Sequence, residues 1–383
     1  MPAMKRLFYF SIVLLIVFEI LNIYFIMPLP GSQKMNSLDF AYFLHQWRWF
    51  FRFIIAVGIL VSLHKAFAVR RKWIPVVVMM IAGAIVYMAN FEMRADKIFL
   101  QPRQLIFVPE EDNNVPLDRL IIGIKHNGET KAYPIAFLAY HHQVFDQIGG
   151  VQVIVTYCSV CRSGRAFEPK VKGKLEKFRL VGMDHFNAMF EDETTGSWWR
   201  QENGKAVTGK LKGEQLPEII SQQMSLSKWL ELYPDSKIMQ ADPNFMDEYD
   251  NAGKFEKGTS KSSLTGTSEV EWGDKSWVVG VEINGVSKAY SWIDLKEQSL
   301  INDKVGGKSI IVALSKDNNS FVVLENPTGL KAEIHADKII IGKEQFNFSG
   351  EGINTKTKLT TVPAYQEFWH SWLTFHPRTL KYE

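Results

Sequence analysis

The sequence predicts an α+β, β-rich protein in which an N-terminal region of three transmembrane helices is followed by two related β-rich lobes. Three apolar runs within the first 92 residues are long enough to cross a bilayer as helices. A hairpin pattern with an Asn-Gly turn occurs twice, at Asn127 and again at Asn284. Both cysteines of the 383-residue chain, Cys158 and Cys161, lie in the first copy with two residues between them. These observations indicate a membrane region, a duplicated scaffold and one chemically distinctive site.

The transmembrane region is predicted over residues 1–92, with spans at about 7–27, 50–69 and 73–90. Lys5 and Arg6 precede the first run, as in a signal peptide. However, this run is longer than a signal peptide's apolar core, and two more apolar segments follow, so an uncleaved span is the better interpretation. Glu19, inside the first span, is either a functional carboxylate or a side chain that faces a neighbouring helix.

The basic residues of the short loops predict the orientation of the three helices in the membrane. Most of them precede the first span or lie between the second and third: Lys5, Arg6, Lys65, Arg70, Arg71 and Lys72, against Lys34 and Arg48 in the first loop. We therefore expect a cytoplasmic N-terminus in a bacterial inner membrane, with the lipid bilayer as partner and the chain from about residue 91 extracytoplasmic or periplasmic. A formal net charge of +3 gives no indication of nucleic-acid binding.

After a proline-containing linker at residues 93–118, the two lobes are predicted at residues 119–240 and 277–383. A polar excursion at residues 241–276 separates them. The hairpin of residues 120–133 matches that of residues 278–290, and the match continues without a gap through Gly149-Gly150 and Gly306-Gly307. Both lobes end in a Trp-containing helix followed by a proline. An internal duplication is the economical explanation.

The two copies of the repeat share their scaffold residues but differ at the cysteines. Cys158 is aligned with Ser315, and Cys161 with Asn318. Because the second lobe has the scaffold without the cysteines, we expect the first lobe to be the active one. The second lobe is predicted to be degenerate and to support or shape the site.

A Cys-x-x-Cys pair fits few structural purposes. A disulfide across two intervening residues removes little entropy from the unfolded chain. The spacing suits a reversible disulfide, a thiolate of lowered pKa, or half of a soft-metal site. In an oxidising compartment, a chain that depended on disulfides for stability would usually carry more than one pair.

The motifs of the first lobe resemble a bacterial domain-of-unknown-function family, numbered 3179. The resemblance rests on Tyr133-Pro134, on His141 followed by Asp146, on Gly149-Gly150, on Thr156 to Cys161, and on Asp192 to Gln201. Selenocysteine occurs in the Cys-x-x-Cys motif of some relatives, so the resemblance implies redox chemistry. The chain departs from the family pattern at His142, where relatives have Glu, and at Ser159-Val160, where they have Pro-Leu.

Within this site, Cys158 is predicted to attack and Cys161 to resolve. His141 is the candidate base or charge partner, with a capping role for the same side chain as the alternative. Arg162 could supply positive charge near the sulfurs or could be an ordinary solvated residue at a turn. Further candidates for the lining of a pocket are Tyr157, His142, His185, Trp199 and Gln201.

Three functions remain open at this point. The first is a membrane-anchored thiol-disulfide oxidoreductase or redox relay without a cofactor, acting on a thiol or disulfide partner outside the cytoplasm. The second is a copper or zinc site that uses Cys158, Cys161 and a histidine such as His141. The third is a tethered binding module in which the cysteines form a structural disulfide. The sequence has no phosphate-binding glycine loop, Rossmann fingerprint, haem attachment motif or serine nucleophile elbow.

Overall fold

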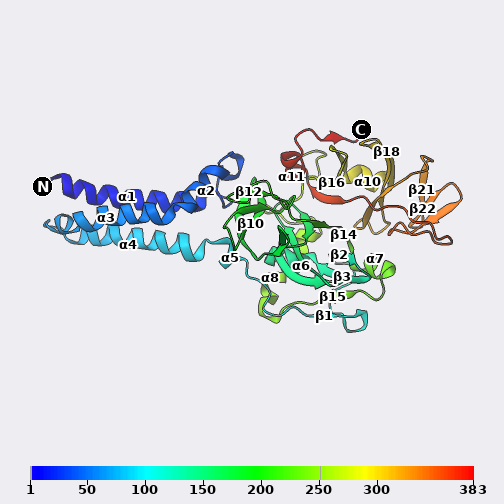
Figure 1. Ribbon diagram of the computed structural model, residues 1–383, viewed down its shortest axis with the longest axis horizontal. Helices are drawn as coiled ribbons and strands as arrows, with labels where there is room; N and C mark the ends of the chain where they lie inside the picture. The colour runs from blue at the N-terminus through cyan, green and yellow to red at the C-terminus, as the bar shows by residue number, and fades with distance from the viewer. Residues whose placement is uncertain (1, 251) are drawn as a thin grey trace. The chain divides into compact units, whose positions relative to one another are not determined.

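The computed structural model describes residues 2–250 and 252–383, and its secondary structure is mixed α+β, as predicted (Figure 1). The chain divides into two compact units. The first contains the segments up to Leu100, Glu176–Arg200 and Lys205–Glu214. The second contains Gln101–Leu175, Gln201–Gly204 and Gln215–Glu383.

Three long helices, α1 (Pro2–Tyr24), α3 (Arg48–Phe67) and α4 (Trp73–Tyr87), lie side by side in the first unit (Figure 1). A π-helical turn, η2 (Met88–Glu92), continues α4. The segments Ala3–Tyr24, Arg48–Phe67 and Trp73–Glu92 are long and apolar enough to cross a membrane. The three predicted spans therefore coincide with helices, apart from small differences at their ends.

A polar triad joins these three apolar helices. Arg52 of α3 donates from Nε and Nη2 to the carboxylate of Glu19 in α1, at 2.7 and 2.8 Å. Asn90 of η2 accepts from Arg52 Nη2 at 2.6 Å and donates to Glu19 Oε2 at 2.8 Å. Glu19 is almost completely buried. It therefore faces its neighbouring helices, which is one of the two alternatives expected for it.

A small antiparallel sheet completes the first unit. Its strand order is β12-β11-β10-β9, and its buried residues Val181, Met189 and Trp198 pack against Ile26 and Ala41 of the N-terminal region. The shorter elements of this unit are η1 (Ser32–Lys34), α2 (Leu38–Gln46), α5 (Ala95–Ile98), β9 (Phe178–Asp184), β10 (Asn187–Asp192), β11 (Trp198–Arg200) and β12 (Ala206–Thr208).

The second unit begins with two sheets, in strand orders β1-β15-β3-β2-β14 and β13-β6-β5-β4. Their strands are β1 (Phe107–Val108), β2 (Leu120–His126), β3 (Glu129–Pro134), β4 (Gln143–Ile148), β5 (Val151–Cys158), β6 (Ser163–Phe167), β13 (Glu218–Ile219), β14 (Ser221–Ser225) and β15 (Lys237–Met239). The other elements of this part are η3 (Glu110–Asp112), α6 (Ile135–His141), β7 (Lys170–Val171), β8 (Lys174–Leu175), α7 (Leu226–Leu232), η4 (Pro243–Phe245), α8 (Met246–Asp250) and α9 (Ala252–Glu256).

The C-terminal part of this unit has three further sheets, in strand orders β24-β16-β17-β25, β18-β19-β20 and β21-β22-β23. Their strands are β16 (Trp277–Ile283), β17 (Val286–Ser291), β18 (Leu300–Val305), β19 (Lys308–Leu314), β20 (Phe321–Glu325), β21 (Ala332–His335), β22 (Lys338–Ile341), β23 (Glu344–Phe346), β24 (Ala364–Phe368) and β25 (Leu380–Lys381). The helices are α10 (Trp292–Gln298) and α11 (Trp369–Phe375). Alternating apolar residues of β16, β19 and β20 form a buried core here.

The two expected hairpins form with the same register. Gly123 lies opposite Ala132 in one hairpin, and Gly280 lies opposite Ala289 in the other. Asn127 and Asn284 both adopt a positive φ at their turns. The Asn-Gly signal therefore fixes both turns as the sequence predicts, because asparagine and glycine tolerate this conformation.

The Glu19–Arg52 pair provides a test of how the helices are held together. Glu19→Gln should lower the stability of the detergent-solubilised full chain by about 3 kcal/mol, because it leaves the largely buried Arg52 charge without a carboxylate. Removing both charges in Glu19→Gln/Arg52→Gln should cost less than the sum of the single changes. Thermal unfolding of the wild type, both single variants and the double variant measures this coupling. Additive losses would show that the pair does not stabilise the bundle.

Candidate functional site

The two cysteines lie at the tight connection between strands β5 and β6, residues 158–163, which is called the cysteine connection below. Strand β5 ends at Cys158, β6 begins at Ser163, and these two residues are paired in the sheet. Arg162, in the connection, has a φ of 60°. Cys158 is 1% exposed and Cys161 is completely buried. No disulfide joins them in this structure.

The surroundings of Cys161 favour the protonated thiol. Burial raises the pKa of Cys161 well above its usual value, and the hydrogen bond and charge of Cys158 raise it further. Ser371 lowers this pKa through a hydrogen bond, while the charge of Glu367 raises it. Ser371 Oγ also donates to Glu367 Oε2 at 2.8 Å. The Cys161 thiol therefore rests in its protonated, weakly nucleophilic form.

A lysine and a histidine also lie beside the cysteine connection. Lys275 Nζ donates to the backbone carbonyl of Val160 at 2.9 Å and lies 3.1 Å from His370 Nε2. Burial lowers the pKa of Lys275, while the charges of Cys161 and Cys158 raise it. Burial and the nearby Lys275 lower the pKa of His370 to about 4. Lys275 is therefore a cation that can interact with a thiolate here.

These neighbours were not singled out from the sequence. Lys275 lies in the polar segment 241–276, which the sequence predicts to separate the lobes, and Glu367, His370 and Ser371 lie in or beside α11. They are more than 100 residues from the cysteines, and none of them belongs to a motif that marks a catalytic or metal-binding role. His370 and Ser371 lie within the repeated tryptophan helix, which is the sequence signal nearest to these residues.

Arg162 is completely buried and is not a solvated turn residue. Its Nη1 and Nη2 donate to the carbonyls of Phe255 and Glu256 at 3.0 and 2.9 Å. Its Nε donates to Gln366 Oε1 at 3.1 Å, and its guanidinium lies 3.5 Å from the ring centroid of Trp277. Arg162 therefore ties the cysteine connection to α9, β16 and β24.

Arg165 forms a second buried connection from β6. Its Nη2 lies 2.7 Å from Glu367 Oε1, and its guanidinium lies 3.1 Å from the ring centroid of Tyr365. Its Nε donates to the carbonyl of Glu202 at 2.8 Å. Arginine can bind a carboxylate and stack on a ring at the same time, which suits it to this position.

Tyr157 and Gln201 line the same strand connection. Burial raises the pKa of Tyr157, and its hydroxyl is buried without a hydrogen-bond partner among the described residues. Gln201 Nε2 donates to Thr156 Oγ1 at 3.1 Å and to the carbonyl of Ser163 at 3.2 Å. Gln201 therefore braces β5 against β6 directly beside Cys158.

Glu256 is a buried carboxylate close to this connection. Its Oε2 forms an ion pair with Arg119 Nε at 2.7 Å, and its Oε1 has no partner in the described part of the chain. Burial raises the pKa of Glu256 to about 7, although the charges of Arg119 and Arg162 lower it. Glu256 therefore changes its charge near neutral pH.

The two adjacent histidines are both buried beside β5. His141 Nε2 lies 2.6 Å from the hydroxyl of Tyr249. His142 has a φ of 61° at the end of α6, and its carbonyl accepts a hydrogen bond from the backbone N–H of Tyr157. Burial lowers the pKa of His142 to about 4. His142 is therefore neutral near pH 7.

Two other residues that the sequence predicts for the site, His185 and Trp199, belong to the first unit, whereas the cysteines belong to the second. His185 Nδ1 lies 2.6 Å from Asp184 Oδ1. Trp199 Nε1 donates to Asp192 Oδ2 at 2.9 Å. Both side chains thus interact with carboxylates of the β9–β12 sheet.

The structure offers no complete ligand set for the copper or zinc alternative. Among residues 2–250 and 252–383, no group of three or more His, Cys, Asp or Glu side chains could hold a metal ion. In this conformation, Cys158 and Cys161 supply two ligands only. A metal at this position would need at least one more.

Comparison with known proteins gives a family match for most of the chain. A family model described as "Protein of unknown function (DUF3179)" matches residues 102–379. This range includes the cysteines and all the residues placed around them above. No curated protein and no solved structure matches the chain.

The raised pKa of Cys161 predicts how its reactivity depends on pH. In a Cys158→Ser variant, where Cys161 is the sole thiol, alkylation of the native protein by iodoacetamide should accelerate about tenfold per unit between pH 7 and 9. Adding Lys275→Met should slow this reaction severalfold, because it removes the neighbouring positive charge. The exposed Lys261→Met change is the matched control. A plateau in the rate near pH 8.5 would instead indicate reaction through local unfolding, with an ordinary thiol pKa.

Glu256 predicts a pH dependence of stability. With a folded-state pKa of about 7, Glu256 keeps its proton in the native chain at pH values where the unfolded carboxyl has lost it. This group therefore lowers the free energy of unfolding as the pH rises from about 4.5 to 7, by up to about 3 kcal/mol, and has no further effect above pH 7.

Glu256→Gln should flatten this part of the stability profile, whereas the exposed Glu269→Gln should leave it unchanged. Thermal unfolding midpoints of the full chain at pH 5, 6, 7 and 8 measure the difference. Parallel profiles for the wild type and Glu256→Gln would show that Glu256 does not titrate in this range.

Proposed function

The chain belongs to the DUF3179 family, whose function is unknown, and from its own site we propose that it is a membrane-anchored thiol-disulfide oxidoreductase or redox relay. The observation that carries the proposal is the arrangement of Cys158 and Cys161. Their thiols are hydrogen-bonded to each other without a disulfide, and the charge of Lys275 acts on both of them. A thiol pair in contact, with a cation beside it, can form and break a disulfide with little movement.

The proposed reaction transfers two electrons to a disulfide of a partner. One cysteine, as a thiolate, attacks the partner disulfide, and one partner sulfur leaves as a thiolate. The second cysteine then attacks the mixed disulfide, which closes the Cys158–Cys161 bond and releases the second partner sulfur. The two protons lost by the cysteines end on the two partner thiols. The reverse direction oxidises the partner.

Burial controls when this reaction can occur. Because both thiols are inaccessible and the pKa of Cys161 is raised, a partner must approach through a local opening beside the connection. Lys275 favours the thiolate once a proton has left. His141, Arg162 and the other predicted residues would then act by positioning the strands around the pair.

We also infer that three helices anchor the chain in a bilayer, with the N-terminus cytoplasmic and the cysteine site on the opposite side. The length and apolar character of the three helices support the anchoring. The excess of basic residues before the first helix and between the second and third supports the orientation. An extracytoplasmic site would suit a disulfide-exchanging pair.

A duplication of the lobe would explain how the site is built. In its support, Asp146 lies opposite Val153 as Asp303 lies opposite Ile310. The ring of Trp229 covers Gly123 as that of Trp372 covers Gly280. Glu367, His370 and Ser371 would then be contributions of the second, cysteine-free lobe to the site of the first.

The tethered binding module remains a second candidate, because complete burial and a raised thiol pKa are also properties of unreactive cysteines. In that case the cysteines would serve only to pack the strand connection. The two functions differ in whether the pair is oxidised and reduced reversibly in the folded chain.

A redox titration of the full chain in detergent separates the two candidates. The wild type should show one reversible two-electron transition at a potential above about −300 mV. Structural disulfides typically have potentials below this value. Cys158→Ser and Cys161→Ser should each show a single thiol and no such transition, and the double variant gives the background. Thiols that stay reduced across the whole range, or a bridge that resists reduction, would contradict the oxidoreductase and favour the binding module.

A further inference from the structure

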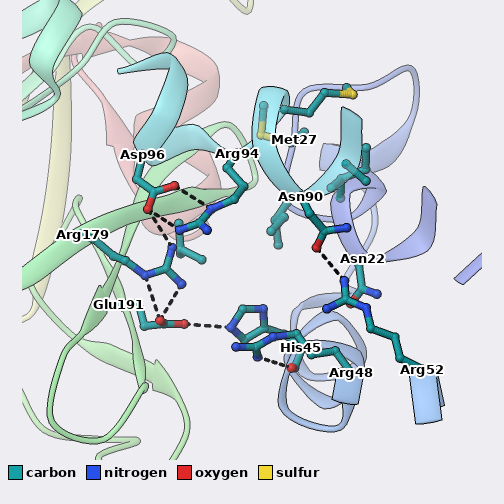
Figure 2. A pocket seen from close by; sticks show the side chains of 15 residues that line it. Asn22, Met27, His45, Arg48, Arg52, Asn90, Arg94, Asp96, Arg179 and Glu191 are labelled. Carbon is teal, nitrogen blue, oxygen red and sulfur yellow. Dashed lines mark hydrogen bonds and ion pairs between the residues drawn. The ribbon is translucent and has the colours of Figure 1, made fainter. Parts of the chain in front are cut away.

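A polar cavity of about 340 Å³ lies at one end of the helix bundle, entirely within the first unit (Figure 2). The end of α1, the start of α3 and the end of η2 surround it, together with β9 and β10. Four arginines face it: Arg48, Arg52, Arg94 and Arg179. So many cations around one small cavity require anions to balance them.

Three of the four arginines have carboxylate partners within the protein. Arg52 binds Glu19 at 2.7 Å, as described above. Arg94 Nη2 lies 2.6 Å from Asp96 Oδ2. Arg179 Nη2 lies 2.6 Å from Glu191 Oε1. These pairs neutralise three of the four charges.

Arg48 is the arginine left without a carboxylate. Its Nη1 donates to the carbonyl of His45 at 2.5 Å, and it forms no ion pair with any residue in the described ranges 2–250 and 252–383. The nearby Glu191 is shared between Arg179 and His45, whose Nε2 lies 3.0 Å from Glu191 Oε2. Figure 2 shows the Arg48 and His45 side chains together at the edge of the cavity.

The cavity suits an oxyanion in size and chemistry. A volume of about 340 Å³ can hold a small polar group such as a phosphate ester. Guanidinium groups bind phosphate through paired, charge-assisted hydrogen bonds. Asn22 adds a side-chain amide to the lining, and the N–H of this amide that does not donate to the carbonyl of Phe18 can donate to a further oxygen. The unbalanced charge of Arg48 would be neutralised by such a ligand.

We propose that this cavity binds an anionic phosphate ester, with Arg48 as the residue that contacts the phosphate. The source can be the headgroup of an anionic phospholipid or a soluble phosphate ester. The position favours the lipid, because the cavity lies where three apolar helices end, at the level of headgroups if they cross a bilayer. Trp47 and Trp49, which are 52% and 70% exposed, flank Arg48 as aromatic residues do at a membrane interface.

The test uses the full chain in a neutral detergent and follows its thermal unfolding while phosphatidylglycerol is added. The wild type should be stabilised by the lipid, and Arg48→Gln should need about tenfold more lipid for half of the effect. Arg70→Gln, an exposed arginine between α3 and α4, is the matched control and should respond as the wild type does. Arg48→Lys keeps the charge without the paired guanidinium donors and should give a response between those of the wild type and Arg48→Gln.

Two further additions identify the source of the phosphate. Diacylglycerol, which lacks the phosphate, should not stabilise the chain, and glycerol 3-phosphate tests a soluble ester. Stabilisation by phosphatidylglycerol alone supports the lipid headgroup, and stabilisation by both phosphate compounds supports a general phosphate-ester site. An equal response of the wild type and Arg48→Gln, or an equal effect of diacylglycerol, would overturn the proposal. Unfolding of both arginine variants without ligand shows whether each is folded.

Discussion

The cysteine site depends on two arginines that are buried without access to water. Arg162 and Arg165 lie on either side of the first residues of β6, and both reach into segments that lie more than 30 residues further along the chain. A buried guanidinium is tolerated only where its donors and its charge are compensated. The carbonyls of Phe255 and Glu256 and the carboxylate of Glu367 provide that compensation. The cysteine connection can therefore take this conformation only when the C-terminal part of the unit is folded against it.

This dependence explains why the neighbours of the thiols come from distant parts of the sequence. Phe368 donates its backbone N–H to the carbonyl of Cys161, which places the start of α11 directly against the cysteines. Glu367 and Ser371 are thereby held beside Cys161, and His370 beside Val160. The same contacts that compensate Arg165 also set the electrostatic surroundings of the thiol. Stability and thiol reactivity are consequently coupled through Glu367.

The sequence predicted the features that depend on local patterns. The apolar runs predicted the three long helices, and the Asn-Gly turns predicted the two hairpins, because chain length and turn conformation are properties of a few adjacent residues. The site was predictable only as far as the Cys-x-x-Cys motif. Lys275 and His370 were not predictable, because their proximity to Val160 arises from tertiary packing. The burial of Arg162 also follows from such packing, and a turn residue would ordinarily be expected in solvent.

Under the proposed duplication, equivalent positions of the two lobes carry different residues around the cysteine site. Met224 lies opposite Ile121 in the first lobe, at the position where Glu367 lies opposite Val278 in the second. The first lobe thus has an apolar side chain where the second has the carboxylate that binds Arg165. Conversely, the second lobe has Ser315 and Asn318 where the first has its cysteines. Under the proposed duplication, neither lobe alone would contain both the thiols and the carboxylate of Glu367. If the chain is duplicated as proposed, the proposed site would need both lobes, which would give a physical reason for a chain to retain a second lobe without cysteines.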